Sequence, residues 1–224
     1  MKLNKMIDHT KLGANVDQQQ IDKLVLEAKT YDFKSVCVNP IWVKYVKEQL
    51  KESDVLVCTV IGFPHGTHQK EVKAFEAKVA VEDGADELDM VINVHALRSK
   101  NDHLIVEEIK GVVNEAKGRV VKVILETCYL TPEEIKRGSK LAVQAGASFV
   151  KTSTGFGTSG AKIEDVKLMK EAVGNHAQVK ASGGVRTYED ALKMIEAGAT
   201  RIGTSNGIDI INQRRDNDDS NASY

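Results

Sequence analysis

The 224-residue sequence is poor in cysteine and aromatic residues, and it has almost no excess of charge. Its three cysteines, Cys37, Cys58 and Cys128, are odd in number and widely spaced, which argues against a disulfide framework or a zinc motif. Aromatic residues make up only 5% of the chain, so a platform that stacks nucleic-acid bases is not expected. With 31 basic and 32 acidic residues, the chain shows no charge bias toward a nucleic-acid or membrane partner.

Long hydrophobic runs are also missing. No apolar stretch reaches the roughly 18 residues of a transmembrane helix, and residues 1–8 lack the apolar core of a signal peptide. We therefore expect a cytoplasmic protein with no membrane partner. The length suits one domain, residues 1–213, followed by a tail at 214–224 that is rich in Asn, Asp and Ser and is expected to be flexible.

The sequence does contain eight short apolar segments that are typical of β-strands. The β-branched run at 120–125 is characteristic of a strand buried on both faces, as in a parallel sheet. The predicted strands are residues 6–10, 35–39, 55–62, 87–93, 120–127, 149–153, 178–182 and 201–205.

Amphipathic segments separate these strands and predict helices. Residues 16–31 carry an apolar stripe with helical spacing. Thr131, Pro132 and Glu134 form a strong helix-start signal. Strict alternation predicts an α/β fold, a single-domain (β/α)8 TIM barrel with an N-terminal helix and a short C-terminal tail. A doubly wound open sheet is the alternative, but no G-x-G-x-x-G motif follows the first strand.

Two lysines, Lys151 and Lys180, lie in the sixth and seventh predicted strands. A lysine amine is a nucleophile only when neutral, and its ordinary pKa of about 10.4 keeps it charged. Burial and a second cation nearby both lower the pKa of an amine. Because active sites of barrels lie at the C-terminal ends of the strands, the pair suggests Schiff-base chemistry. Either lysine alone could instead be a strand-end residue that extends to solvent.

Asp89 lies in the apolar run 87–93, where a carboxylate is costly unless it is paired. It is either a proton-transfer group for the lysines or a structural partner of a buried lysine such as Lys122. Side chains of a barrel strand alternate between the interior and the helix layer. Residues 89, 91 and 93 should therefore share one face, as should residues 122, 124 and 126.

Glycine-bearing segments follow the seventh and eighth predicted strands: Gly183-Gly184 and Gly203-Thr204-Ser205. Barrels frequently bind a substrate phosphate at these two loops through backbone N–H groups. One Gly-Gly pair is an ordinary turn signal, whereas two such loops side by side predict a phosphate site. The segment that begins at Thr152 is expected to add donors beside it.

Histidines provide the one candidate metal motif. His65 and His68 are two residues apart, but they follow Phe63-Pro64, which disfavours a helical register, and no carboxylate cluster lies nearby. A loop or helix-cap role is favoured, and no metal is expected.

Three segments, 87–93, 149–155 and 180–186, resemble the deoxyribose-phosphate aldolase family, and segments 7–10, 36–40, 62–66 and 124–127 resemble it in the same order. The resemblance implies a class I aldolase on a TIM barrel that needs no metal or cofactor. It would cleave 2-deoxy-D-ribose 5-phosphate reversibly into glyceraldehyde 3-phosphate and acetaldehyde. The resemblance also implies that Lys151 forms the Schiff base and that Asp89 and Lys180 transfer protons.

The expected partner is a small sugar phosphate, and the expected assembly is a homodimer or homotetramer. Tyr224 resembles the terminal tyrosine that assists proton transfer in this family. Ser182 and Asn206 depart from the family's more common Ala and Ser, changes small enough to leave phosphate access. Another lysine-dependent barrel aldolase, such as a transaldolase or keto-acid aldolase, and a phosphate-binding barrel without catalysis stay open as alternatives. Further pocket positions implied by the resemblance are Asp8, Thr10, Cys37 and Lys122.

Overall fold

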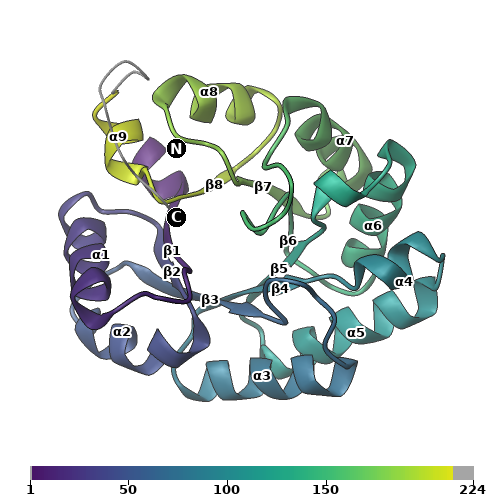
Figure 1. The fold of residues 1–224 in the computed structure, drawn as a ribbon, viewed down its shortest axis with the longest axis horizontal. Coiled ribbons are helices and arrows are strands. Elements are labelled where there is room, and N and C mark those ends of the chain that lie inside the picture. The colour runs from purple at the N-terminus through teal and green to yellow at the C-terminus, as the bar shows by residue number, and fades with distance from the viewer. Residues whose placement is uncertain (1, 214–224) are drawn as a thin grey trace.

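The computed structural model describes residues 2–213, and its strands close into an eight-stranded parallel barrel (Figure 1). Each strand pairs in parallel with the next along the chain, and the eighth pairs with the first. This closure confirms the predicted (β/α)8 barrel and excludes the open doubly wound sheet. The strands are β1 (Ile7–Lys11), β2 (Ser35–Val38), β3 (Leu56–Ile61), β4 (Glu87–Val91), β5 (Val120–Ile124), β6 (Phe149–Lys151), β7 (Gln178–Ser182) and β8 (Arg201–Thr204).

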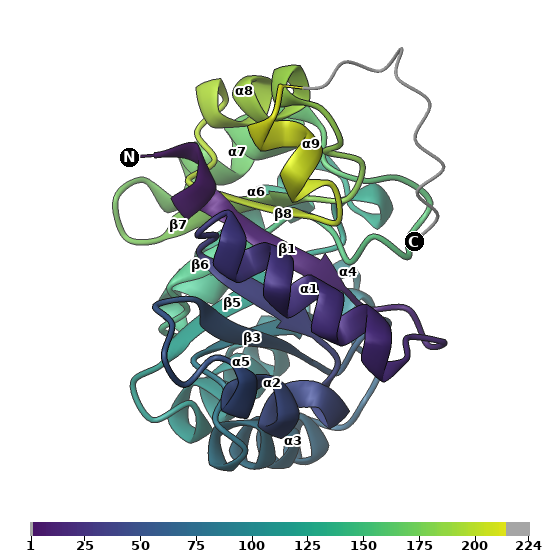
Figure 2. The ribbon, with the colours of Figure 1, turned by 90° about the vertical axis from the view of Figure 1, so that its left-hand side faces the viewer.

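Helices surround the barrel in chain order, and Figure 2 shows α1 crossing in front of the strands. The N-terminal helix expected before the barrel is a single 3-10 turn, η1 (Leu3–Met6). Within residues 2–213 no helix has the length and apolar character needed to cross a membrane. The predicted tail, residues 214–224, lies outside the described residues. The α-helices are α1 (Gln18–Thr30), α2 (Val43–Gln49), α3 (Lys70–Glu82), α4 (Val94–Arg98), α5 (Asp102–Glu115), α6 (Pro132–Gln144), α7 (Ile163–Val173), α8 (Tyr188–Glu196) and α9 (Gly207–Ile211), with two further 3-10 turns, η2 (Pro40–Trp42) and η3 (Thr127–Tyr129).

Helix starts follow the local sequence signals. Thr131 accepts a hydrogen bond from the backbone N–H of Glu134, whose side chain accepts one from the backbone of Thr131. This reciprocal capping box satisfies two backbone donors that the first turn of a helix leaves unpaired. It confirms the start predicted for α6.

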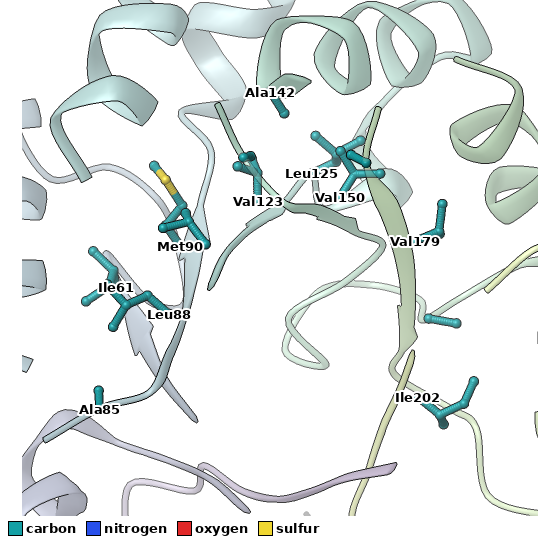
Figure 3. Close-up of a cluster of buried hydrophobic side chains, with 14 of the residues drawn as sticks. Ile61, Ala85, Leu88, Met90, Val123, Leu125, Ala142, Val150, Val179 and Ile202 are labelled. Carbon is teal, nitrogen blue, oxygen red and sulfur yellow. The ribbon is translucent and has the colours of Figure 1, made fainter. Parts of the chain in front are cut away.

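Alternation along the strands divides the core into two layers. Figure 3 shows Leu88, Met90, Val123 and Val150 packed between strands and helices, where they belong to one large apolar cluster. The intervening residues of the same strands, Asp89 among them, contact one another inside the barrel. The predicted two-residue period therefore holds along these strands.

The period ends sooner than expected at two strand ends. β4 stops at Val91, and Asn93 caps α4 by accepting the Ala96 N–H at 3.0 Å. β5 stops at Ile124, and Glu126 takes a left-handed conformation with φ of 55°. The expectation that Asn93 and Glu126 continue the interior faces of their strands is wrong, because capping and a backbone reversal redirect both side chains.

Two ion pairs bridge α3 and α5, one buried and one exposed. Lys73 Nζ lies 2.8 Å from Glu108 Oε1, and both side chains are almost completely buried. Lys73 Nζ also donates to the backbone oxygens of Gly66 and Val91, at 2.8 Å each. The buried pair therefore joins two helices to the loop after β3 and to the end of β4. The exposed pair joins Lys70 to Glu107 at 2.9 Å.

We predict that Lys73→Met lowers the free energy of unfolding by about 3–5 kcal/mol, because it leaves Glu108 buried without a cationic partner. The matched control is Lys70→Met, which should cost no more than about 1 kcal/mol because that pair is solvated. Urea denaturation of both variants measures the difference. Equal losses would show that burial does not set the value of the Lys73 pair.

Candidate active site

Asp89 is the centre of a buried charge network inside the barrel. Its Oδ1 lies 2.7 Å from Lys122 Nζ, and its Oδ2 lies 2.8 Å from both Lys151 Nζ and Lys180 Nζ. Lys151 and Lys180 are register partners on β6 and β7, as Asp89 and Lys122 are on β4 and β5. The structure thus brings together the three residues predicted to carry the chemistry. Burial raises the pKa of Asp89, but attraction to the three lysines outweighs it and holds this pKa well below its ordinary value.

Lys180 and Lys151 differ in their surroundings. Lys180 is fully buried, and its Nζ lies 2.5 Å from Asp8 Oδ2 in addition to its contact with Asp89. Burial lowers the pKa of Lys180, but the two carboxylates raise it above its ordinary value and so favour the cation. Lys151 contacts Asp89 and lines the pocket that opens above the network. Position therefore distinguishes a fixed cation from a lysine that a substrate can reach.

Arg201 and Glu87 complete the network and were missed in the sequence. Arg201 donates to Asp8 Oδ1 and to Glu87 Oε2, at 2.8 Å each, and Glu87 Oε2 also lies 2.6 Å from Lys122 Nζ. Both residues begin a strand and precede a recognised interior position by two residues. The strand period could have revealed them.

The pocket lies at the ends of β1, β6, β7 and β8 and contains part of the predicted set. Thr10, Lys151, Gly183, Gly203, Thr204 and Ser205 are among its lining residues, together with Leu12, Thr154 and Phe156, which were not predicted. Asp8, Cys37, Lys122, Thr152 and Gly184 are not among its lining residues, and the first four are buried.

Two of the buried residues support the site through hydrogen bonds. Thr152 Oγ1 donates to the Ser182 carbonyl at 3.1 Å and accepts the Ser182 N–H at 3.1 Å. Ser182 Oγ donates to the Ser153 carbonyl at 2.6 Å. The serine that departs from the family pattern therefore adds a cross-link between the ends of β6 and β7.

The glycine loops at β7 and β8 bring backbone close to the lysines. Gly183 and Gly184 have φ of 80° and 78°, a conformation that favours glycine. A side chain at Gly203 would place its Cβ 2.9 Å from Lys180 Cε. Thr204 Oγ1 donates to the Val185 carbonyl at 2.7 Å, which ties the two loops together. These loops leave exposed backbone and Ser205 beside the lysines.

Glu126 and Thr154 build the opposite rim and were not predicted as site residues. The Glu126 carboxylate accepts hydrogen bonds from Thr154 Oγ1 and from the Thr154 N–H. Phe156, two residues further, meets Phe63 edge-on with 5.4 Å between ring centroids. The contact closes the rim between the loops after β3 and β6. A left-handed glutamate carries no sequence signal comparable to glycine, which explains why it was missed.

His65 and His68 are both exposed, and neither belongs to a cluster of possible metal ligands among residues 2–213. The cluster that does occur in this part of the chain consists of Cys37, Cys58 and Asp89, whose donor atoms lie within 4.8 Å of one another. Asp89 already bonds three lysine amines, and a metal cation there would face their charge. The donor set is therefore poorly suited to a metal.

A closed barrel with a pocket-facing lysine, a shared carboxylate and a second buried lysine defines an enzyme of the amine-catalysis class. Residues 2–213 match the model of the DeoC/LacD family aldolases, and the chain belongs to that family. It is 60% identical over 211 residues to the deoxyribose-phosphate aldolase of Streptococcus sanguinis (strain SK36), with 94% of this chain and 96% of that protein covered.

Other relatives agree over the same extent. The deoxyribose-phosphate aldolase of Acholeplasma laidlawii (strain PG-8A) is 55% identical over 224 residues, which cover 100% of both chains. The solved tetrameric deoxyribose phosphate aldolase of Aeropyrum pernix superposes with a TM-score of 0.88 at 35% identity, covering 94% of this chain and 89% of that one. Family membership thus rests on nearly the whole chain.

The network predicts a defined dependence of stability on pH. The pKa values of Asp8 and Asp89 are lowered in the folded protein, whereas unfolded carboxyl groups titrate near about 3.9. Their contribution to the free energy of unfolding is complete above that pH and is lost as the pH falls through the folded values. The pKa values of Lys122 and Lys180 are raised, so their contribution is complete below about 10.4 and is lost as the pH rises beyond it.

We predict that Asp8→Asn lowers the free energy of unfolding at neutral pH by about 3–5 kcal/mol, because Lys180 and Arg201 lose a buried partner. It should also flatten the loss of stability between about pH 5 and 2, because one fewer carboxylate takes up a proton on unfolding. Urea denaturation across a pH series measures both effects. Asp32→Asn, which removes an exposed partner of Lys5, is the control and should leave the acid slope unchanged. An unchanged slope in Asp8→Asn would contradict the assignment.

Proposed function

We propose that this chain is a deoxyribose-phosphate aldolase, which cleaves 2-deoxy-D-ribose 5-phosphate reversibly into glyceraldehyde 3-phosphate and acetaldehyde during deoxyribose catabolism. The observation that carries the proposal is the asymmetry of the lysine pair. Lys151 lines the pocket, whereas Lys180 is buried between Asp8 and Asp89. Family membership and the names of the close relatives support the same substrate.

The proposed reaction begins when neutral Lys151 attacks the C1 aldehyde of the open-chain sugar. Loss of water forms an iminium ion, which withdraws electrons from the bond between C2 and C3. A base removes the C3 hydroxyl proton, the C2–C3 bond breaks, and glyceraldehyde 3-phosphate leaves. The remaining enamine takes a proton at its terminal carbon, and water then releases acetaldehyde and the free Lys151 amine.

Asp89 and Lys180 have complementary roles in this scheme. Asp89 Oδ2 is 2.8 Å from Lys151 Nζ, so its negative charge stabilises the positive iminium nitrogen. The same oxygen is 2.8 Å from Lys180 Nζ, which provides a path for protons between the two amines. Lys180 remains a cation beside Lys151 and favours the neutral form of its neighbour. Lys122 holds Asp89 in place from the side away from the pocket.

The phosphate of the substrate is assigned to the loops after β7 and β8. Gly183, Gly203, Thr204 and Ser205 line the pocket on that side of Lys151. Backbone N–H groups and the Ser205 hydroxyl are suitable donors for a phosphate, and glycine lets the ligand approach the backbone closely. Thr152 and Gly184 support the same loops from behind.

We also propose that the enzyme acts in the cytoplasm as a homodimer or homotetramer. Free Cys37, Cys58 and Cys128 suit a compartment that keeps thiols reduced. The predicted proton relay, Tyr224, lies outside the described residues and stays a prediction.

Borohydride trapping tests the assignment of the amine. Acetaldehyde with sodium borohydride should convert the iminium to an N-ethyl lysine, which peptide mass spectrometry should locate at Lys151. Lys151→Met should abolish the adduct and lower kcat/KM by more than about 10⁴-fold, the upper value for one proton-transfer group. Lys180→Met should lower kcat by about 10²- to 10⁴-fold. Lys11→Met, which removes another pocket-lining lysine, is the control and should keep the adduct.

Other outcomes separate the competing functions. An adduct on Lys180 would reverse the two roles. Phosphate-sugar binding without any adduct would favour a phosphate-binding barrel that lacks catalysis. An adduct without release of acetaldehyde from deoxyribose 5-phosphate would favour a transaldolase or keto-acid aldolase.

We predict that Ser205→Asp raises KM for 2-deoxyribose 5-phosphate by about 10- to 100-fold, because a carboxylate repels the phosphate at close range. Ser205→Asn, which is similar in size but neutral, is the control and should change KM far less. Steady-state assays should include free 2-deoxyribose, for which the two variants should agree. A carboxylate effect of equal size on both sugars would place the phosphate elsewhere.

A further inference from the structure

Exposed apolar side chains gather on one flank of the barrel, away from the active-site pocket. Val72, Phe75 and Val79 project from α3 with exposed fractions of 48%, 65% and 39%, and Ile41 of η2 is 84% exposed beside them. All four line one hollow between η2 and α3. Figures 1 and 2 both place α2, which follows η2, next to α3 at the lower edge of the molecule. A contiguous apolar patch of this kind marks an interaction surface.

The order of side chains along α3 identifies the kind of partner. His68, Val72, Phe75, Val79 and Asp83 line the same hollow at spacings of three or four residues, so they lie on one face of the helix. We call these five residues the α3 stripe. Its centre is apolar, one end carries a basic group and the other end an acidic group. Apolar centres with polar rims are typical of protein interfaces.

Reversal of the stripe produces its own complement. If two copies of α3 pack antiparallel about Phe75, Val72 faces Val79 of the partner subunit. His68 then faces Asp83 of the partner subunit, and the same pair recurs on the other side of the axis. A two-fold interface requires this property, that a patch matches itself after rotation. A different protein would have no reason to match a reversed order.

We infer that the α3 stripe, with Ile41 beside it, is the surface through which two copies of this chain form a two-fold dimer. Ile41 projects next to the hollow that it helps to line, and so offers a knob and a hole in one patch. Residues 214–224 are a poor alternative occupant, because their sequence contains Arg, Asp, Asn and Ser with Ala222 and Tyr224 as the exceptions. The inference concerns assembly and holds whether or not the proposed reaction is correct.

Sedimentation velocity of the full chain tests the surface. The wild-type protein should sediment as a dimer or as a multiple of it. Phe75→Glu places two like charges beside the axis and should halve the mass of the assembly, because desolvated like charges oppose association. Leu26→Glu, on α1 and outside the patch, is the matched control and should leave the mass unchanged, since Leu26 is similarly exposed at 66%. Circular dichroism and borohydride trapping verify that each variant is folded.

Charge exchange tests the antiparallel register. His68→Asp and Asp83→Lys should each raise the dissociation constant by about 10-fold, because each sets like or unmatched groups opposite one another. The double variant should restore the wild-type value, because the exchanged charges face each other again. A monomeric wild-type protein, or a Phe75→Glu variant that keeps its mass, would overturn the inference. Failure of the double variant to recover would overturn the antiparallel arrangement.

Discussion

The carboxylate of Asp89 is the interaction on which the rest of the barrel interior depends. A buried carboxylate is costly unless it is paired, and this one bonds lysines from three successive strands, β5, β6 and β7. One fully buried anion therefore fixes three amines at known distances. It positions Lys151 for chemistry, joins Lys180 to the same oxygen and is itself held by Lys122. Stability and reactivity share the same group because the site uses the anion that neutralises the core.

The balance of charge inside the barrel gives a physical reason for one neutral lysine. Each carboxylate contacts at least two cationic groups, and Lys122, Lys180 and Arg201 each contact at least two carboxylates. Three carboxylates are matched by these three cations, and a fourth charge on Lys151 would leave an excess in a low-dielectric interior. Lys151 is also the member that faces the pocket. The interior is thus electrically closed when Lys151 is the free amine that a carbonyl requires. The three carboxylates are those of Asp8, Glu87 and Asp89.

The sequence predicted the barrel because eight strands of period two alternate with capped, amphipathic helices. It predicted Lys151, Lys180 and Asp89 because charged residues stand out in apolar strands. Which lysine forms the Schiff base could not be derived from spacing, since the difference is burial between Asp8 and Asp89. Residues that act through tertiary contacts were also hidden. The ion pair between Lys73 and Glu108 forms across two helices, and neither helix alone shows it.

Helix α3 connects the proposed interface to the pocket rim. Its inner side carries Lys73, whose amine holds the Gly66 carbonyl in the loop after β3, and its outer side carries the α3 stripe. Phe63 of that loop packs edge-on against Phe156, which lines the pocket beside Lys151. A second copy packed on α3 would restrain the helix that anchors this loop, and so would limit motion of the aromatic rim. Assembly and catalysis would then be coupled through one helix, although no residue of the stripe lines the Lys151 pocket.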